Sequence, residues 1–361
     1  MNIKSLLIGS AAALAVVSGA QAADAVVAAE PEPLEYVRVC DAYGTGYFYI
    51  PGTETCLKIG GHLRFEKYYE DAKGSDEYYE WHTRGRIEID AKNDSEWGTV
   101  YSWIRVQGDS YNNNTQDDVG GGNQTRWFYY FGIGGLEFGR FDSPGIRFQG
   151  YGGLTDWGGA YGDEWDRQYV SYTFNYDNFS AYIAIENDLV NGVNYNYTAG
   201  VDTDGDGVPD VFETRNDQND GGEEYLPDIS AGVKGKFGDY EVGAVLGYDE
   251  SDESFNVRGW LYGEAGIVRF KGLALYSDSE FNSFFHYDGF SAILGLGADV
   301  TDTVSISKDI QWWDDDSWRV IGNVNWKVAS GFSVLLEASY GDGDSVGDEV
   351  KTGMLRFQRS F

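Results

Sequence analysis

The chain has 361 residues, of which 49 are glycine, 6 are proline and 16% are aromatic. Its formal net charge of -33 excludes nucleic acid as a partner, because contacts with phosphates require a basic surface. Charged residues make up 24% of the chain, and no apolar run of about 18 residues occurs after the N-terminal segment, so a bundle of membrane helices is excluded as well.

The N-terminus carries the pattern of an export signal. Lys4 precedes an apolar run from Leu6 to Val17, and small residues follow up to Ala22. A positive start, an apolar core of about a dozen residues and a small-x-small site are typical of a secretory signal peptide. The sequence therefore predicts residues 1–22 as a signal peptide that is cleaved after Ala22.

Residues 23–54 are predicted to form a periplasmic N-terminal extension, which contains one of the two cysteines of the chain. In an exported protein the pair Cys40 and Cys56 is most simply a disulfide that closes a short loop. Free thiols and a metal site are the alternatives. A metal site would need more soft ligands than His62, the one candidate nearby.

From Thr55 onward the chain alternates between strand-like segments and turns. Tight connections, such as Asp177–Asn178 and Gly238–Asp239, alternate with longer ones that are rich in Asp, Asn, Ser and Gly. The predicted strands, about 16 in number, cover residues 55–70, 79–93, 97–111, 124–133, 135–142, 167–177, 179–189, 227–237, 239–250, 255–265, 267–278, 287–300, 303–313, 317–328, 331–341 and 350–361.

Within these segments one face is apolar and the other is polar. Ile87 and Ile89, for example, alternate with Arg86 and Glu88. Short turns at one rim, long loops at the other and an even number of strands are typical of outer-membrane barrels, whereas a β-sandwich has no reason to alternate its connections. The sequence therefore predicts an all-β fold, a transmembrane antiparallel up-and-down β-barrel over residues 55–361.

The connection from Ser143 to Asp166 is long and rich in glycine and aromatic residues. It could cap the barrel from outside or fold into its lumen. Carboxylates gather toward its end: Asp156, Asp163, Glu164 and Asp166.

A set of arginines on the neighbouring strands is the counterpart of these acids. Each could simply be a solvated side chain in a wet interior. Together, guanidinium groups that face an acidic loop would create a transverse field across a constriction. The residues with lumenal parity are Arg64, Arg84, Arg86, Arg105, Arg126 and Arg167, and Arg140 lies where the parity is ambiguous.

A second long connection, residues 190–226, holds a calcium-loop spacing. The segment from Asp202 to Glu213 matches D-x-D-x-D-G-x5-E, although no amphipathic helices flank it. An acidic solvated loop is the alternative to a Ca²⁺ site. The predicted ligands are Asp202, Asp204, Asp206, the Val208 carbonyl, Asp210 and Glu213.

The chain ends on a strand-like segment, Val350–Phe361, in which Leu355, Phe357 and Phe361 share one face. The final strand of an outer-membrane barrel closes the cylinder against the first strand. A terminal phenylalanine on such a strand also resembles the recognition signal of bacterial outer-membrane proteins.

The run from Glu35 to Gly61, which contains both cysteines, resembles the start of the alphaproteobacterial, rhizobial-type outer-membrane general porins. The signal peptide, the 143–166 connection and Phe361 agree, so the resemblance covers essentially the whole chain. It implies a homotrimer of 16-stranded barrels with an inward-folded third loop, surrounded by outer-membrane lipid and lipopolysaccharide.

The predicted function is a general diffusion porin, a water-filled channel for small hydrophilic solutes and ions, and not an enzyme. An outer-membrane barrel hydrolase and a secreted, soluble calcium-binding β-protein are the alternatives. Catalysis finds little support, because the three histidines, His62, His82 and His286, fall in no catalytic motif. Ca²⁺ is the one cofactor that the sequence suggests.

Overall fold

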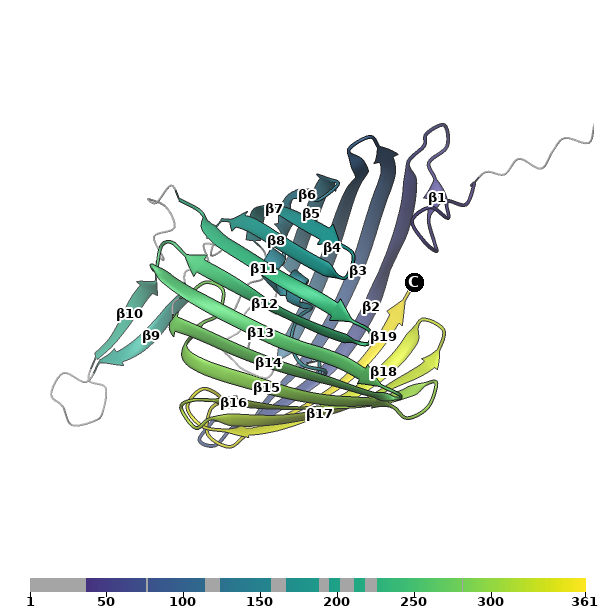
Figure 1. Ribbon diagram of the computed structural model, residues 1–361. Coiled ribbons are helices and arrows are strands. Elements are labelled where there is room, and N and C mark those ends of the chain that lie inside the picture. The colour runs from purple at the N-terminus through teal and green to yellow at the C-terminus, as the bar shows by residue number, and fades with distance from the viewer. Residues whose placement is uncertain are drawn as a thin grey trace, which may run out of the picture. The chain divides into compact units, whose positions relative to one another are not determined.

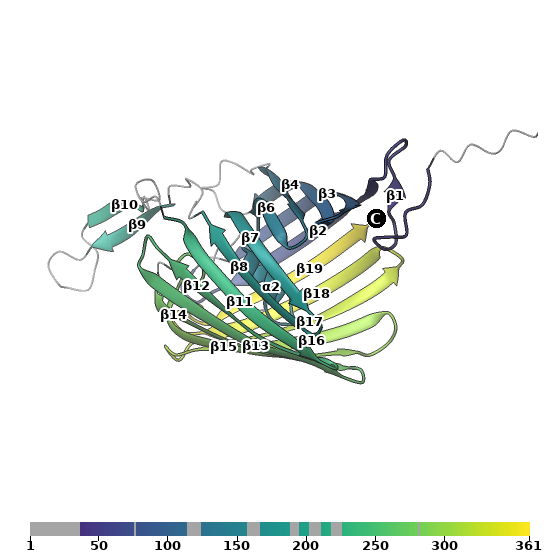
Figure 2. The ribbon, with the colours of Figure 1, turned by 45° about the horizontal axis from the view of Figure 1, so that its top comes forward.

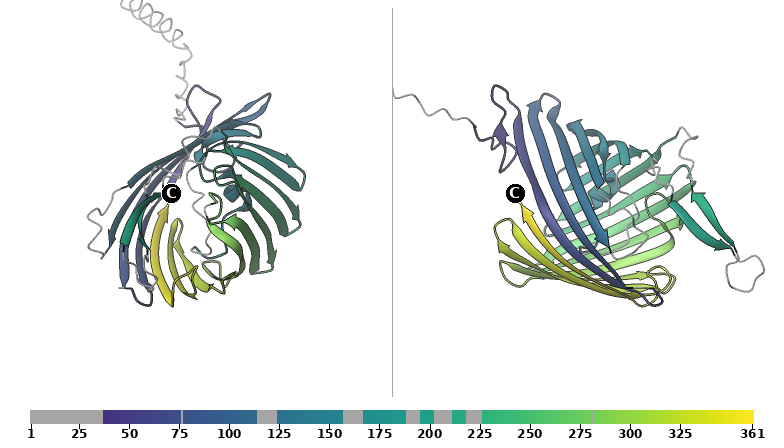
Figure 3. Two further views of the ribbon diagram at one scale, coloured as in Figure 1. Left: turned by 90° about the vertical axis from the view of Figure 1, so that its left-hand side faces the viewer. Right: turned by 180° about the vertical axis from the view of Figure 1, so that it is seen from behind.

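The structure is a computed structural model that describes residues 37–75, 77–113, 124–156, 167–187, 195–201, 211–217, 226–280 and 282–361. Antiparallel strands close into one barrel (Figures 1 and 3). The predicted signal peptide, residues 1–22, lies outside the described residues, as do residues 23–36 of the predicted extension. Both remain predictions.

The barrel has 16 strands, as predicted. They are β2 (Cys56–Asp71), β3 (Tyr78–Ser95), β4 (Gly98–Asn113), β5 (Gln124–Ile133), β6 (Leu136–Phe141), β7 (Arg167–Tyr176), β8 (Phe179–Glu186), β11 (Asp228–Phe237), β12 (Tyr240–Asp249), β13 (Ser254–Ala265), β14 (Val268–Ser279), β15 (Tyr287–Asp299), β16 (Val304–Trp313), β17 (Trp318–Ala329), β18 (Phe332–Asp342) and β19 (Val350–Ser360).

The last strand closes the barrel against the first. β19 pairs with β2 in a register that runs from Lys351 opposite Asp71 to Ser360 opposite His62. Beyond it, Phe361 exchanges two backbone hydrogen bonds with Gly61, at 3.1 and 3.2 Å. Closure leaves the barrel without a free sheet edge, which is the condition for strands to cross a bilayer.

The outward face of the barrel is apolar and the inward face is polar. On β2, Leu63 points outward and is 60% exposed, whereas Glu66 points inward and is 6% exposed. Leu294 on β15 and Leu336 on β18 are each 58% exposed. This inversion of the usual pattern is stable only where hydrocarbon replaces water outside the barrel. No helix in the described residues is long and apolar enough to cross a membrane.

Four elements were not predicted from the sequence. They are β1 (Phe48–Tyr49), α2 (Pro144–Gln149), and a separate two-stranded hairpin of β9 (Tyr195–Val201) and β10 (Val211–Asp217). The hairpin, visible in Figure 1, lies within the connection for which the sequence analysis gave no strand. In β9 the sequence alternates Tyr195, Tyr197 and Val201 with Asn196, Thr198 and Gly200, a strand pattern that the surrounding acidic residues obscure.

The predicted disulfide is present. Cys40 and Cys56 are bonded and fully buried beside Tyr47. The Tyr47 hydroxyl donates to Asp90 at 2.6 Å, and the Tyr43 hydroxyl donates to Asp94 at 2.7 Å. Partial burial and this bond to Asp94 raise the pKa of Tyr43 to about 12. The loop is thus attached to the inward face of β3 near its end.

Candidate functional site

The segment after β6 turns into the barrel through a short helix. The Ser143 side chain accepts a hydrogen bond from the Gly145 amide at 3.2 Å, and Pro144 begins the helix with a suitable fixed φ. Gly150 ends the helix at a φ of 83°, a conformation that favours glycine. Local sequence therefore places α2 immediately after the barrel wall, and Figure 2 shows it among the strands.

α2 packs on an apolar part of the inner wall. Ile146, which is 2% exposed, lies in a cluster of buried side chains from five strands. Phe148 lies with its ring 4.7 Å from that of Tyr182. The helix therefore covers apolar surface that would otherwise be in contact with water. The wall residues of the cluster are Tyr182, Ala184, Val245, Trp260, Leu273, Leu275 and Ile293, joined by Phe285 from the segment before β15.

Buried charges hold the segment beyond α2 by its backbone. Lys271 on β14 donates to the carbonyls of Gly150 and Tyr151 at 3.1 and 2.9 Å. Asp309 on β16 accepts from the backbone amides of Leu154 and Thr155 at 2.8 and 2.7 Å. These bonds do not depend on the side chains of the segment, so they fix its path along the inner wall.

The segment then reaches the closing strands of the barrel. The Asp156 amide donates to Glu337 on β18 at 2.8 Å. The Asp156 carboxylate accepts two hydrogen bonds from the guanidinium of Arg356 on β19, which also donates to Glu66 on β2. Asp156 is predicted from the sequence, but Arg356 is not, because it lies on the last strand, 200 residues away in the sequence.

The predicted arginine wall lies on the inward faces of β2 to β5, and each arginine there has a partner. Arg84 donates to Asp109 at 2.6 Å, and Arg105 lies 2.8 Å from Glu88. The other three bonds join Arg64 to Gln358 at 3.0 Å, Arg86 to Gln107 at 2.9 Å, and Arg126 to Asp109 at 3.2 Å.

His82 connects two carboxylates of this wall. Its ring nitrogens lie 2.5 Å from Glu66 and 2.8 Å from Asp109, and its ring stacks on Tyr111 at 4.5 Å. Each ring nitrogen thus lies within hydrogen-bonding distance of one carboxylate. A chain of polar contacts through Glu66 and His82 therefore links the Asp156–Arg356 pair to Asp109.

Charges of both signs face this side of the lumen, within the described residues. The cations include Arg64, Arg84, Arg86, Lys92, Arg105, Arg126 and Arg356, and the carboxylates include Glu66, Glu70, Glu80, Glu88, Asp90, Asp109 and Asp156. This side of the lumen is therefore lined by paired charges of both signs.

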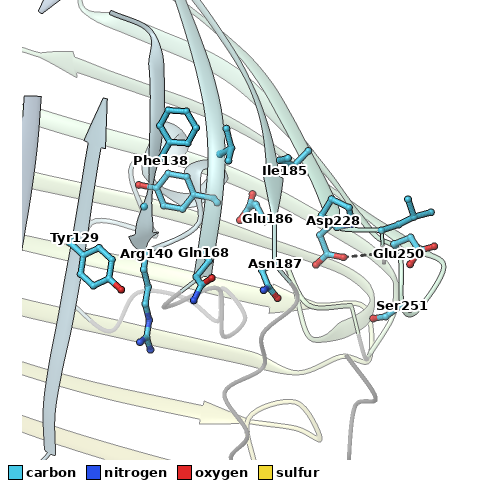
Figure 4. A pocket seen from close by; sticks show the side chains of 15 residues that line it. Tyr129, Phe138, Arg140, Gln168, Ile185, Glu186, Asn187, Asp228, Glu250 and Ser251 are labelled. Carbon is cyan, nitrogen blue, oxygen red and sulfur yellow. Dashed lines mark hydrogen bonds between the residues drawn. The ribbon is translucent and has the colours of Figure 1, made fainter. Parts of the chain in front are cut away.

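Arg140 does not belong to the lumenal wall. The next residue, Phe141, is 6% exposed and points inward, so Arg140 has the outward parity. Its partners in the sheet are Tyr129, which is 46% exposed, and Gln168. Figure 4 shows these three side chains together at the end of β6, in the lining of a cavity of about 680 Å³.

Arg167 faces inward but has partners of its own. It lies 2.9 Å from Asp228 and donates to the Ser283 carbonyl at 2.7 Å. Both partners lie outside β2 to β5, so Arg167 is not part of the arginine wall. The other predicted acids, Asp163, Glu164 and Asp166, lie outside the described residues.

The predicted calcium loop also falls largely outside the described residues, which include neither Asp202 nor any residue up to Asp210. Glu213 belongs to β10, where its Cα lies opposite Ala199. No group of three or more potential metal-ligating side chains occurs in the described part of the chain.

A closed barrel with an apolar outer face, a charged lumen and an internal segment is a diffusion channel of the outer membrane. Residues 24–357 match the family model described as "Porin subfamily", and the chain belongs to that family. It is 34% identical to the porin Omp2b of Brucella neotomae and to that of Brucella abortus, in each case over 100% of both chains. The predicted alphaproteobacterial porin family, outer-membrane location and porin function are thus confirmed.

Solved structures of low sequence identity share the fold. The outer-membrane channel DcaP of Acinetobacter baumannii matches 87% of this chain and 99% of its own, with a TM-score of 0.60 at 11% identity. OmpF of Salmonella typhi, solved with daunomycin, matches 85% of this chain and 98% of its own, with a TM-score of 0.60 at 10% identity. The family assigns a channel to this chain.

Proposed function

We propose that the 142–156 segment and the arginine wall together form the constriction that selects small hydrophilic solutes. The observation that carries the proposal is the anchoring of this segment to Lys271, Asp309 and Glu337, on strands far along the barrel from β6. A segment held in this way narrows the lumen permanently. The charges opposite it then act on every solute that passes.

Planar-bilayer recording tests this proposal. Purified protein should form open, ohmic pores, and uncharged polymers of increasing size should stop entering at one sharp size limit. Silence of bilayers across well-folded preparations would overturn the channel. A gradual exclusion limit, unaffected by changes in the 142–156 segment, would overturn the constriction.

We further propose a homotrimer, as the family resemblance implies. β6 has 6 residues, whereas β2 and β4 have 16 and β3 has 18. At roughly 3.3 Å per residue, β6 spans about 20 Å even without tilt, less than the apolar band of about 25 Å. A protein neighbour would cover this low part of the wall better than lipid. Native mass spectrometry in detergent should give three copies.

The rest of the apolar face is proposed to contact outer-membrane lipid, with lipopolysaccharide around the long-loop rim. Outward side chains such as Leu294 and Leu336 support this placement. Co-purification of lipopolysaccharide with folded trimer, measured by mass spectrometry, tests it. Its absence from trimers extracted in mild detergent would count against specific contact.

The segment from Asp202 to Glu213 is proposed to bind Ca²⁺ weakly, with a dissociation constant of roughly 10⁻⁴–10⁻³ M as in extracellular sites. The proposal rests on the spacing of its carboxylates and on the glycine at the sharp turn. Calorimetric titration of the native protein against Glu213→Gln decides it. Equal heats for the two proteins would leave only an acidic loop.

A further inference from the structure

A neutral polar area lies beside the constriction, on the inner wall near the short turns. It lines a cavity of about 550 Å³, and Thr155 and Asp156 of the 142–156 segment also line this cavity. The area is formed by β16, β17 and β18 near the ends of those strands that meet the turns at residues 300–303 and 330–331. Short turns face the periplasm in outer-membrane barrels, so this cavity opens toward the periplasmic side of the constriction.

Strand register sets the spacing of the polar groups. Ser305 lies opposite Asn325, and Ser307 lies opposite Asn323, on neighbouring strands. Paired residues on adjacent strands are about 5 Å apart, and successive inward residues on one strand are about 7 Å apart. The wall thus presents hydroxyl and amide groups in a fixed grid, whose spacing is comparable with that of hydroxyl groups across one sugar ring.

Several of these groups have unused hydrogen-bonding capacity. Among the described residues, the side chains of Ser305, Ser307, Asn325 and Ser333 donate to and accept from no other protein group. All four are half-buried on the inward face. A hydroxyl and a primary amide can each donate and accept, so the wall suits a solute that does both at several points.

The charges around the grid are already compensated. Arg356 is bound by Asp156 and Glu66, and Arg269 lies 3.2 Å from Asp299. Arg64 lies 3.6 Å from the Glu66 carboxylate and donates to the neutral Gln358 at 3.0 Å. The neighbouring carboxylate of Glu337 accepts from Asn323 and from the Asp156 amide. A neutral solute therefore meets charged groups that already have partners in the protein.

From this geometry we propose that the Ser305–Asn325–Ser333 wall is a binding subsite for small neutral polyhydroxylated solutes, such as sugars and polyols. The inference rests on the proposed channel function and names the class of solute that its lumen favours. Such a solute replaces water at several wall groups at once as it leaves the constriction, and each group supplies one hydrogen bond without a charge to desolvate.

Single-channel recording with maltose tests the subsite. Maltose on the periplasmic side should reduce the ion current in a saturable way and add binding noise. Polyethylene glycol of similar mass is the matched probe, because its ether oxygens only accept hydrogen bonds. It should reduce the current only in proportion to its effect on bulk conductivity.

Variants locate the effect on this wall. The triple variant Ser305→Ala, Asn325→Ala, Ser333→Ala should raise the half-blocking maltose concentration about tenfold, since up to three hydrogen bonds are lost. The double variant Ser171→Ala, Thr173→Val changes the same kinds of group on β7 and should leave the block unchanged.

Each outcome decides one point. Equal block by maltose and the polymer, or equal block in the native protein and the triple variant, overturns the subsite. If only the β7 double variant loses the block by maltose, maltose binds to another wall, and this result also overturns the subsite. Ion conductance without added solute reports separately on the channel, so a silent bilayer would refute the proposed function rather than the subsite.

Discussion

Two parts of the same inner wall follow the same alternation and carry opposite chemistry. On β2 to β5 the inward residues include Arg84 and Asp109, whereas on β12 and β13 they include Val245 and Trp260. The difference follows from what lies over each part. α2 covers the second wall and excludes water, while the first wall stays wet. The alternation along a strand therefore sets which side chains point into the lumen. Whether a polar or an apolar side chain is stable there depends on whether water or α2 lies over it.

The strongest test of this comparison removes the cover. Ile146→Asp places a charge within a buried apolar cluster, where it has no described partner. α2 should leave the wall, and the conductance should rise by about twofold as the lumen widens. Single-channel recording measures the change, and heat-modifiable gel mobility checks that the barrel remains folded.

Ile146→Val is the matched control. Loss of one methylene from such a core costs about 0.5–1.5 kcal/mol, too little to release the helix given its other anchors. Conductance should match that of the native protein. If Ile146→Asp also keeps native conductance in a folded barrel, the apolar wall does not hold α2 in place.

The second prediction alters the wet wall. Arg84→Gln with Arg86→Gln removes two positive charges that face the lumen, so the cation-to-anion permeability ratio should rise by about two- to threefold. The reversal potential in a salt gradient measures it. Arg140→Gln removes the same charge from the outward face and should change nothing. An unchanged potential in the double variant would place these arginines away from the controlling field.

The barrel could be predicted because its signals are local and repeated. Alternation of Ile87 and Ile89 with Arg86 and Glu88 fixes faces within a strand, and glycine- or asparagine-containing turns fix its ends. The predicted strand ends accordingly lie within a few residues of the observed ones. The direction of Arg140 is ambiguous from the sequence because β6 has only six residues, too few for their alternation to decide the face.

The constriction could be predicted only in part, since its contacts join residues far apart in the sequence. Asp156 and Arg356 are 200 residues apart, and Leu154 and Asp309 are 155 apart. No local sequence pattern predicts that the members of either pair are in contact. The sequence gives no role to His82, because neither Glu66 nor Asp109 is recognisable as its partner before the register of β2, β3 and β4 is known.

The third prediction concerns the contact between the segment and the last strand. Arg356→Gln removes the partner of the Asp156 carboxylate but leaves the backbone anchors at Asp309 and Glu337. Mean conductance should change by less than about a fifth, while current noise in the open state increases. Arg359→Gln is the control, because Arg359 is exposed and lies on the outward face of the same strand. A twofold conductance change in Arg356→Gln would make this ion pair the main anchor.

The smallest effect is expected at the disulfide loop. Cys40→Ser with Cys56→Ser removes a cross-link between residues 16 apart, which in the chain-entropy model is worth about 3 kcal/mol to the ordered loop. The Tyr47 hydrogen bonds to Asp90 and Lys92 remain, so the loop should open more often without leaving β3. Limited proteolysis should then cut between residues 40 and 56 faster, with conductance unchanged within about a tenth.

The untreated native protein should show no alkylatable thiol by mass spectrometry, because both sulfurs are bonded. A conductance increase as large as that expected for Ile146→Asp would mean that this loop, and not the segment beside α2, sets the narrowest part of the channel.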